Sequence, residues 1–202
     1  MTITILGLGG SLRPGSVTTL ALRIALAGAE AAGVSTQLLD LATLPLPLFN
    51  GTYSLEEYTP EGREAILTLL NATRNAQGFI FASPTYHNTI SGSLKNALDY
   101  MELLKDDVPP RLEGKVVGLM SVQFGISGTG NHTITTMLLA ARAMRAWVAP
   151  TMVAVPDSSQ MFNEEGQPYD PTLVQRLHAL GTEVARASEM FANHWTTPQK
   201  RG

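Results

Sequence analysis

Cysteine is absent from this chain of 202 residues. Its absence excludes disulfide bonds, thiolate nucleophiles, and zinc or iron–sulfur centres held by cysteine. Histidine could still bind a metal, but the four histidines show no ligand spacing; they are His87, His132, His178 and His194. The sequence therefore predicts no metal site.

Charged residues make up only 15% of the chain, and the formal net charge is -3. Because nucleic acids attract basic patches, this balance predicts no nucleic-acid partner, and it gives no reason to expect a membrane-surface partner. No apolar run reaches the length of a transmembrane helix, and no signal-peptide pattern opens the chain. With cysteine absent as well, we expect a cytoplasmic protein.

Hydrophobic residues, by contrast, make up 44% of the chain, enough for one globular domain with a sizeable core. Five apolar runs predict strands: Thr2–Leu8, Val34–Leu39, Gly78–Ser83, Lys115–Val122 and Trp147–Val155. Pro150 interrupts the last run, which predicts that this strand lies at an edge or starts late.

Helical patterns separate and follow these runs: Thr18–Ala32, Pro60–Ala76, Gly92–Leu103, Thr129–Arg145 and Pro171–Met190. This alternation predicts an α/β fold with a parallel sheet and helices on both faces. We expect one domain over residues 1–191 and a polar C-terminal tail over residues 192–202.

Ligands of open α/β sheets bind beyond the carboxyl ends of the strands, where the strand order reverses. The loops 9–18, 83–93 and 121–131 should therefore converge on one site. Two long irregular segments, 42–59 and 156–170, are expected to shape it, because long loops in compact domains often serve function. The second contains Phe162–Gly166, which predicts a turn or hairpin.

The first of these loops has the sequence Gly9-Gly10-Ser11-Leu12-Arg13-Pro14-Gly15-Ser16 and leads into a helix. Glycines, hydroxyl groups and an arginine at a helix start are typical of a phosphate site, because backbone N–H groups and the helix dipole face an anion there. The spacing fits neither a dinucleotide fingerprint nor a P-loop. An ordinary connection with Ser16 as the helix N-cap is the alternative.

The third loop, Ser121–Asn131, contains Gly125, Gly128 and Gly130, which permit close approach of a ligand to the backbone. The second has the sequence Ser83-Pro84-Thr85-Tyr86-His87-Asn88-Thr89-Ile90-Ser91-Gly92. Combined with Gly10-Ser11-Leu12-Arg13 and Ser16, it resembles the NADPH-dependent FMN reductase family. The resemblance covers about residues 2–190. It implies a flavodoxin-like, FMN-binding domain with five parallel strands in the order 2-1-3-4-5.

The resemblance also implies the roles of individual residues. Ser11, Arg13 and Ser16 correspond to the cradle of the flavin phosphate, assisted by the backbone N–H groups of Gly15 and Val17. The second loop corresponds to the wall and edge of the flavin ring, through Pro84, Thr85, Tyr86, His87 and Asn88. The third loop approaches the pyrimidine end of the flavin, through Ser121 and Gly125.

The implied activity is hydride transfer from NADPH or NADH, through bound FMN, to a small-molecule acceptor in a ping-pong cycle. The family includes flavin, quinone, chromate and azo-dye reductases, so the expected acceptors are quinones, flavins, azo or nitro compounds and metal ions. The flavin carries the chemistry, so no catalytic side chain is assigned. The resemblance also implies a homodimer or homotetramer.

Two other functions stay open: an FMN electron carrier without NADPH activity, and a non-catalytic binding or regulatory module. Arg13 and the small net charge argue against the carrier. Flavodoxin-like electron carriers are generally much more acidic, and their first loop lacks this arginine. His87 and His132 are each either a site residue or a solvated residue of a turn or helix start.

Near the second loop, Ser91 is expected to cap the following helix, because serine is a preferred N-cap residue. Within that helix, Lys95 and Asp99 are four residues apart and are expected to form a structural ion pair.

Overall fold

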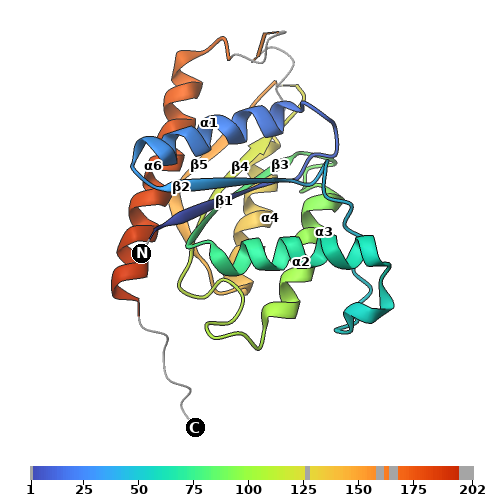
Figure 1. The fold of residues 1–202 in the computed structure, drawn as a ribbon. Helices are drawn as coiled ribbons and strands as arrows, with labels where there is room; N and C mark the ends of the chain where they lie inside the picture. Colours follow the sequence, from blue (N-terminus) through green and yellow to red (C-terminus); the bar gives the residue numbers. More distant parts are fainter. Residues whose placement is uncertain (1, 126–127, 158–161, 164–167, 196–202) are drawn as a thin grey trace.

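The computed structural model describes residues 2–125, 128–157, 162–163 and 168–195 (Figure 1). Five parallel strands form one sheet in the order β2-β1-β3-β4-β5, which confirms the predicted fold class and strand order. The strands are β1 Thr4–Gly9, β2 Ser35–Asp40, β3 Gly78–Pro84, β4 Val116–Val122 and β5 Trp147–Val155.

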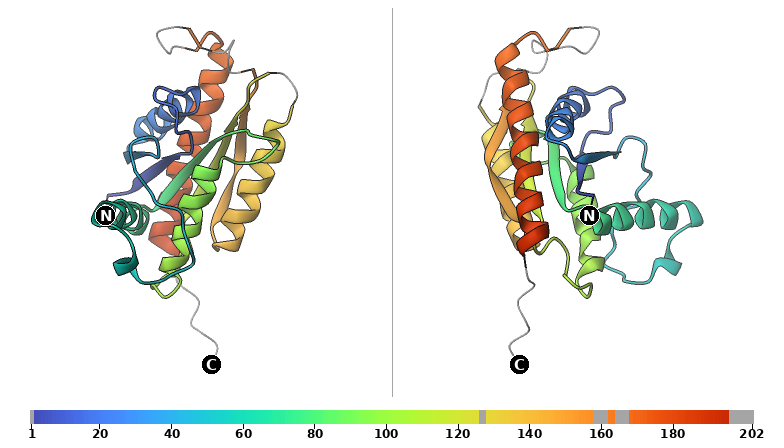
Figure 2. Two further views of the ribbon diagram at one scale, coloured as in Figure 1. Left: turned by 90° about the vertical axis from the view of Figure 1, so that its right-hand side faces the viewer. Right: turned by 60° about the vertical axis from the view of Figure 1, so that its left-hand side comes forward.

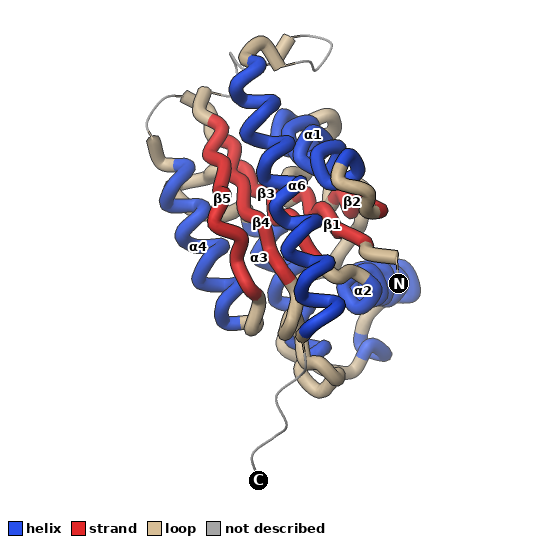
Figure 3. The backbone as a smooth tube through the Cα atoms, turned by 90° about the vertical axis from the view of Figure 1, so that its left-hand side faces the viewer, coloured by secondary structure: helices blue, strands red, loops and turns tan. Residues whose placement is uncertain are grey.

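Helices cover both faces of the sheet, as the alternation predicts (Figures 2 and 3). Helices α1 and α6 lie on one face, and α2, α3 and α4 lie on the other. Their bounds are α1 Val17–Ala31, α2 Pro60–Asn75, α3 Gly92–Tyr100, α4 Gly130–Ala143 and α6 Pro171–His194. Two short 3-10 helices add to them, η1 Leu55–Glu57 and η2 Met101–Leu104.

Alternate residues of each buried strand supply two separate cores. In β3, Phe79 and Phe81 pack among α2, α3 and α4, whereas Ile80 and Ala82 pack among α1 and α6. This division follows from the two-residue period of a strand, which directs successive side chains to opposite faces. Because both faces are covered, β3 is apolar along most of its length, and polar groups begin only where it ends.

Strand β5 lies at the edge of the sheet, which confirms one of the two expectations for Pro150. Its pairing with β4 runs from Val117 opposite Val148 to Leu119 opposite Met152, so β5 carries extra residues between these pairs. Pro150 lies in this irregular stretch, where its missing N–H removes no regular ladder bond.

The chain departs from the predicted elements at two helix ends. The predicted helix Gly92–Leu103 divides after Tyr100 into α3 and the 3-10 helix η2. Helix α6 continues to His194, beyond the predicted end at Met190, and Trp195 then stacks on Phe191 with ring centroids 5.6 Å apart. Residues 196–202 of the predicted tail lie outside the described residues. Among the described helices, none has the length and hydropathy to cross a membrane.

Helices α1 and α6 pack closely enough to require glycine at the contact. A Cβ atom on Gly181 would overlap the backbone carbonyl oxygen of Ala25, and one on Gly28 would overlap that of His178. Backbone atoms cannot move aside as a flexible side chain can, so this contact fixes the two helices against each other.

We expect Gly181→Ala to lower the free energy of unfolding by about 1–3 kcal/mol or more, since overpacking forces the two helices apart. Gly92→Ala is the matched control, because no atom lies within 4 Å of the position of its Cβ. Urea denaturation of both variants tests this, and equal stability of the two would contradict the close-contact explanation.

Candidate functional site

The first and second loops and the end of β4 enclose a cavity of about 160 Å³ at the carboxyl end of the sheet. Eight of the twelve residues assigned from the sequence line it: Ser11, Arg13, Gly15, Ser16, Val17, Pro84, Thr85 and Tyr86. Residues more than 60 positions apart in the chain therefore share one site, because the parallel strands β1, β3 and β4 are neighbours and end on the same side.

The first loop presents several hydrogen-bond donors to this cavity. Ser16 caps α1 by accepting a hydrogen bond from the backbone N–H of Thr19 at 3.2 Å, and Gly15 turns the chain with a φ of +62°. Within the described part of the chain, the N–H groups of Val17 and Thr18 donate to no protein acceptor. They are free because the first N–H groups of a helix have no acceptor within the helix.

Arg13 adds a positive charge to these donors. Its side chain is exposed and forms no ion pair among the described residues, while its backbone N–H donates to the Ser11 hydroxyl at 3.2 Å. Free N–H groups, hydroxyl groups and an unpaired guanidinium at a helix start match the requirements of a phosphate monoester. This donor set fits the phosphate of FMN, and the N-cap role of Ser16 is compatible with it.

Gly10 joins the first loop to the second. Its N–H donates to the carbonyl oxygen of Ala82 at 2.8 Å, and its own carbonyl accepts from the hydroxyl groups of Ser91 at 2.6 Å and Ser93 at 2.7 Å. Ser91 also accepts from the N–H of Leu94 at 3.2 Å, which confirms its predicted role as the cap of α3. The two walls of the cavity are therefore fixed to each other.

The second loop contains a tight hairpin at Tyr86–Thr89. These two residues exchange backbone hydrogen bonds of 3.0 Å in each direction, around a two-residue turn at His87 and Asn88. His87 has a φ of 49° and Asn88 a φ of 65°, as a type I′ turn requires. Both side chains are exposed and neither lines the cavity.

The third loop reaches the cavity through Val122 and Phe124 rather than through the residues assigned from the sequence. Ser121 is fully buried and donates to the carbonyl oxygen of Gly130 at 2.9 Å, so its side chain secures the start of α4. Gly125 has a φ of +83° and does not line the cavity. Ile126 and Ser127 lie outside the described residues, and His132 is exposed in the first turn of α4.

Gln123 organises this loop and has no counterpart among the residues predicted from the sequence. Its side chain is almost fully buried, donates to the carbonyl oxygen of Gly125 at 2.9 Å, and accepts from the N–H of Gly130 and the hydroxyl of Thr129. The available signal was its position: a long polar side chain directly after a strand whose residues are all buried.

The segment 42–59 is held against α3, and none of its residues lines the cavity at the three loops. Asn96 donates to the carbonyl oxygen of Pro47 at 2.8 Å and accepts from the N–H of Phe49 at 2.9 Å. The hydroxyl of Tyr100 donates to the same carbonyl at 3.1 Å, and burial raises the pKa of this phenol. In the other segment, Phe162 pairs with Pro168 in an antiparallel bridge, and residues 164–166 of the predicted turn Phe162–Gly166 lie outside the described residues.

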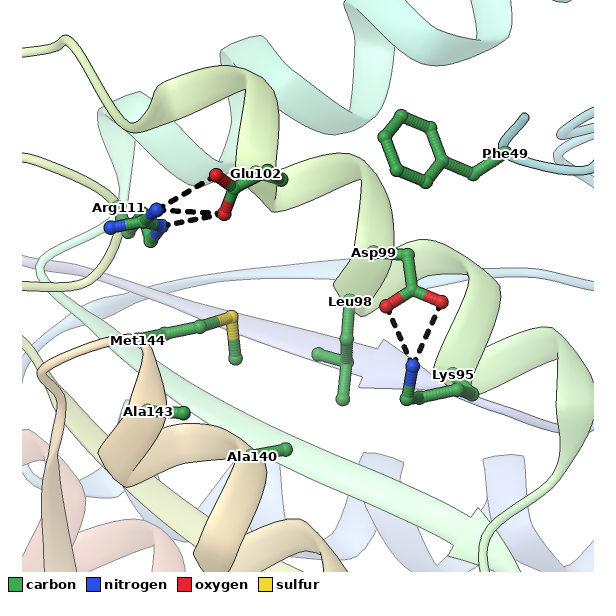
Figure 4. A pocket seen from close by; sticks show the side chains of 9 residues that line it. All are labelled: Phe49, Lys95, Leu98, Asp99, Glu102, Arg111, Ala140, Ala143 and Met144. Atoms are coloured by element: carbon green, nitrogen blue, oxygen red, sulfur yellow. Dashed lines mark hydrogen bonds and ion pairs between the residues drawn. The ribbon is translucent and has the colours of Figure 1, made fainter. Parts of the chain in front are cut away.

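A larger cavity of about 420 Å³ lies between α3, η2 and α4, away from the three loops (Figure 4). Its charged side chains are already paired: Lys95 with Asp99 at 2.7 Å, the predicted ion pair, and Arg111 with Glu102 at 2.7 Å. Alanines and Met144 form the opposite wall (Figure 4). In the described part of the chain, no group of histidine, aspartate and glutamate side chains could hold a metal ion.

A five-stranded parallel sheet with an anion cradle at its switch point defines a flavodoxin-like α/β protein that binds a phosphorylated cofactor. Comparison with known proteins identifies the family within this class. The sequence model of the NADPH-dependent FMN reductase family matches residues 3–160, and the chain belongs to this family. Its cofactor is FMN, and its class of enzyme is the NAD(P)H-dependent FMN reductase.

Individual relatives agree with this family. The NADPH azoreductase of Bacillus sp. (strain OY1-2) is 30% identical over 137 residues, which cover 68% of this chain and 70% of the relative. The NADPH-dependent FMN reductase ArsH of Shigella flexneri is 24% identical, over 95% of this chain and 71% of the relative. The crystal structure of RosB with bound 8-demethyl-8-formylriboflavin-5′-phosphate superposes with a TM-score of 0.77 at 18% identity, over 98% of this chain and 83% of RosB, and supports the fold.

We expect Ser91→Ala to lower the free energy of unfolding by about 1–2 kcal/mol, because it removes the cap of α3 and one of the hydrogen bonds to Gly10. Ser93→Ala is the matched control: it removes the other hydrogen bond to Gly10 but no cap. Thermal unfolding measures the stability of both variants. A larger loss of stability in Ser93→Ala than in Ser91→Ala would contradict the importance of the cap, because Ser93 provides only a hydrogen bond to Gly10.

Proposed function

We propose that this chain is an FMN-dependent oxidoreductase that takes a hydride from NADPH or NADH and reduces a small-molecule acceptor. The observation that carries the proposal is the donor set at the start of α1, fixed against the second loop through Gly10. A phosphate monoester is the ligand that this set fits best. The family whose model spans the same residues is described as NADPH-dependent FMN reductase.

In this proposal Ser11, Arg13 and Ser16 bind the FMN phosphate together with the N–H groups of Gly15 and Val17. The second loop supplies the wall and edge of the ring site, through Pro84, Thr85, Tyr86, His87 and Asn88. Ser121 and Gly125 act from the third loop through the backbone that they hold in place. FMN, when bound, supplies the centre that accepts a hydride and passes two electrons to the acceptor.

The overall reaction that we propose is NADPH + H⁺ + acceptor → NADP⁺ + reduced acceptor, with two electrons and two protons gained by the acceptor. Arg13 is the only charged side chain among the described residues that line the cavity, and no general acid or base is assigned. We propose that the nicotinamide and the acceptor reach the bound flavin in turn through the same open side of the site. This shared access is the basis for proposing a ping-pong cycle. The protein binds and orients both.

The size of the cavity favours a site completed by a second subunit. At about 160 Å³ it is smaller than the roughly 300–1,000 Å³ of typical ligand pockets. We therefore propose a homodimer or homotetramer in which another copy covers the open side. The relatives named azoreductase, FMN reductase and NADPH:quinone oxidoreductase make azo compounds, flavins and quinones the first acceptors to try. The cytoplasmic location expected from the sequence stays a prediction.

The visible absorption spectrum of the purified protein, with FMN added and removed by gel filtration, tests the proposal first. We expect retained flavin bands that bleach within seconds when NADPH or NADH is added without oxygen. Bound flavin that responds to neither nucleotide would favour the electron carrier instead. A protein that retains no flavin would contradict the proposal at its first step.

Arg13→Ala should weaken FMN binding by about 1.5–3 kcal/mol, the scale of a charge-assisted hydrogen bond. Arg23→Ala is the matched control, because Arg23 is an exposed arginine further along α1 that does not line the cavity. Fluorescence titration of the apoprotein with FMN measures both affinities. An unchanged affinity in Arg13→Ala would remove this residue from the phosphate site.

A further inference from the structure

Two exposed aromatic rings flank the candidate site. Tyr86 and Phe124 both line the cavity, and their side chains are 49% and 82% exposed. Large apolar side chains on a protein surface are common singly, but two of them at the mouth of a cavity indicate a binding surface. The other described residues around this cavity are smaller or polar.

Both rings come from loops that follow neighbouring strands of the sheet. Strands β3 and β4 are neighbours, with Pro84 in register with Val122, and the N–H of Thr85 donates to the carbonyl oxygen of Val122 at 2.8 Å. Tyr86 and Phe124 each follow this last pair by two residues. Because β3 and β4 end on the same side of the sheet, both residues reach the same cavity from the loops beyond these strands.

The exposure of Phe124 is built into the backbone on either side of it. The N–H of Gln123 donates to the carbonyl oxygen of Val155 at 3.0 Å. The carbonyl of Gly125 accepts from the Gln123 side chain at 2.9 Å and from the N–H of Asp157 at 3.0 Å. The buried amide of Gln123 therefore holds the backbone on both sides of Phe124, and the ring stays exposed.

Charge is scarce at the same place. Arg13 is the only charged side chain lining the described cavity, and the proposed function commits it to the cofactor phosphate. An acceptor is then met by aromatic surface rather than by an ion pair. This surface suits a flat conjugated molecule, because aromatic rings gain about 0.5–1.5 kcal/mol from stacking beyond the area that they bury.

We propose that Phe124 is a specificity-determining residue that favours flat conjugated acceptors by stacking on them, while Tyr86 forms the cofactor side of the mouth. The inference rests on the proposed function, because the acceptor must reach the same cavity mouth. It goes further by assigning acceptor choice to one residue of the third loop. Acceptors without a flat face gain nothing from this ring.

The test compares two acceptors in the FMN-loaded enzyme. Menadione is flat and takes two electrons: NADPH + H⁺ + menadione → NADP⁺ + menadiol. Ferricyanide is octahedral and takes one electron per ion: NADPH + 2 ferricyanide → NADP⁺ + H⁺ + 2 ferrocyanide. We expect Phe124→Ala to raise KM for menadione about three- to tenfold, with little change in KM for ferricyanide or in FMN affinity.

Two further variants separate stacking from bulk. Phe124→Tyr should retain the wild-type KM for menadione, whereas Phe124→Leu should resemble Phe124→Ala. Met190→Ala, which removes a 67% exposed side chain near the far end of α6, is the control for loss of surface apolar area. Equilibrium dialysis of menadione against the oxidised, FMN-loaded variants gives the same order of affinities without turnover.

Three results would overturn the inference. Equal changes for both acceptors, a wild-type KM in Phe124→Leu, or an effect confined to FMN affinity would each show that the ring does not select the acceptor. The proposed function fails in a different way: a wild-type protein that binds no FMN, or does not oxidise NADPH, fails before any variant is made and takes this inference with it.

Discussion

The backbone of Gly10 is the constraint on which the site depends. Its N–H and carbonyl together form three hydrogen bonds: to Ala82 of β3, to Ser91 of the second loop and to Ser93 at the start of α3. A Cβ atom at this position would lie 2.8 Å from that of Leu94 and 3.0 Å from the Ala82 carbonyl oxygen, so only glycine permits the approach. Without it, the free N–H donors at the start of α1 and the hairpin at Tyr86 would not face one cavity.

The rest of the site follows from where buried strands end. Strands β3 and β4 are buried along their whole length, and their polar side chains, Ser83 and Ser121, come next to last in each strand. The loops that follow these strands are rigid for different reasons. The second closes in a hairpin whose turn residues, His87 and Asn88, both have positive φ, and the third is tied by Gln123. Conformations that cost energy are kept at functional sites when the surrounding structure fixes them.

Much of the fold could be predicted from the sequence. The bounds of β5 agree with the apolar run Trp147–Val155, and of the two expectations for Pro150, an edge strand or a late start, the first is confirmed. The ends of helices were harder to predict, because they depend on tertiary contacts: Trp195 stacks on Phe191, and α6 extends to His194. In the same way, the pattern from Gly92 to Leu103 is helical throughout, but the chain tightens into a 3-10 helix after Tyr100.

The sequence by itself determined the chemical groups of the first loop, because its hydroxyl groups, its arginine and its free N–H groups are local to one strand–loop–helix unit. It also determined the caps Ser16 and Ser91, whose partners lie three residues away. Only the tertiary structure decided the roles of Gln123 and Phe124. The backbone N–H of Gln123 bonds to Val155 of β5, and Phe124 lines a cavity whose other walls come from the first and second loops. Such contacts join segments that are distant in the chain, and no local pattern encodes them.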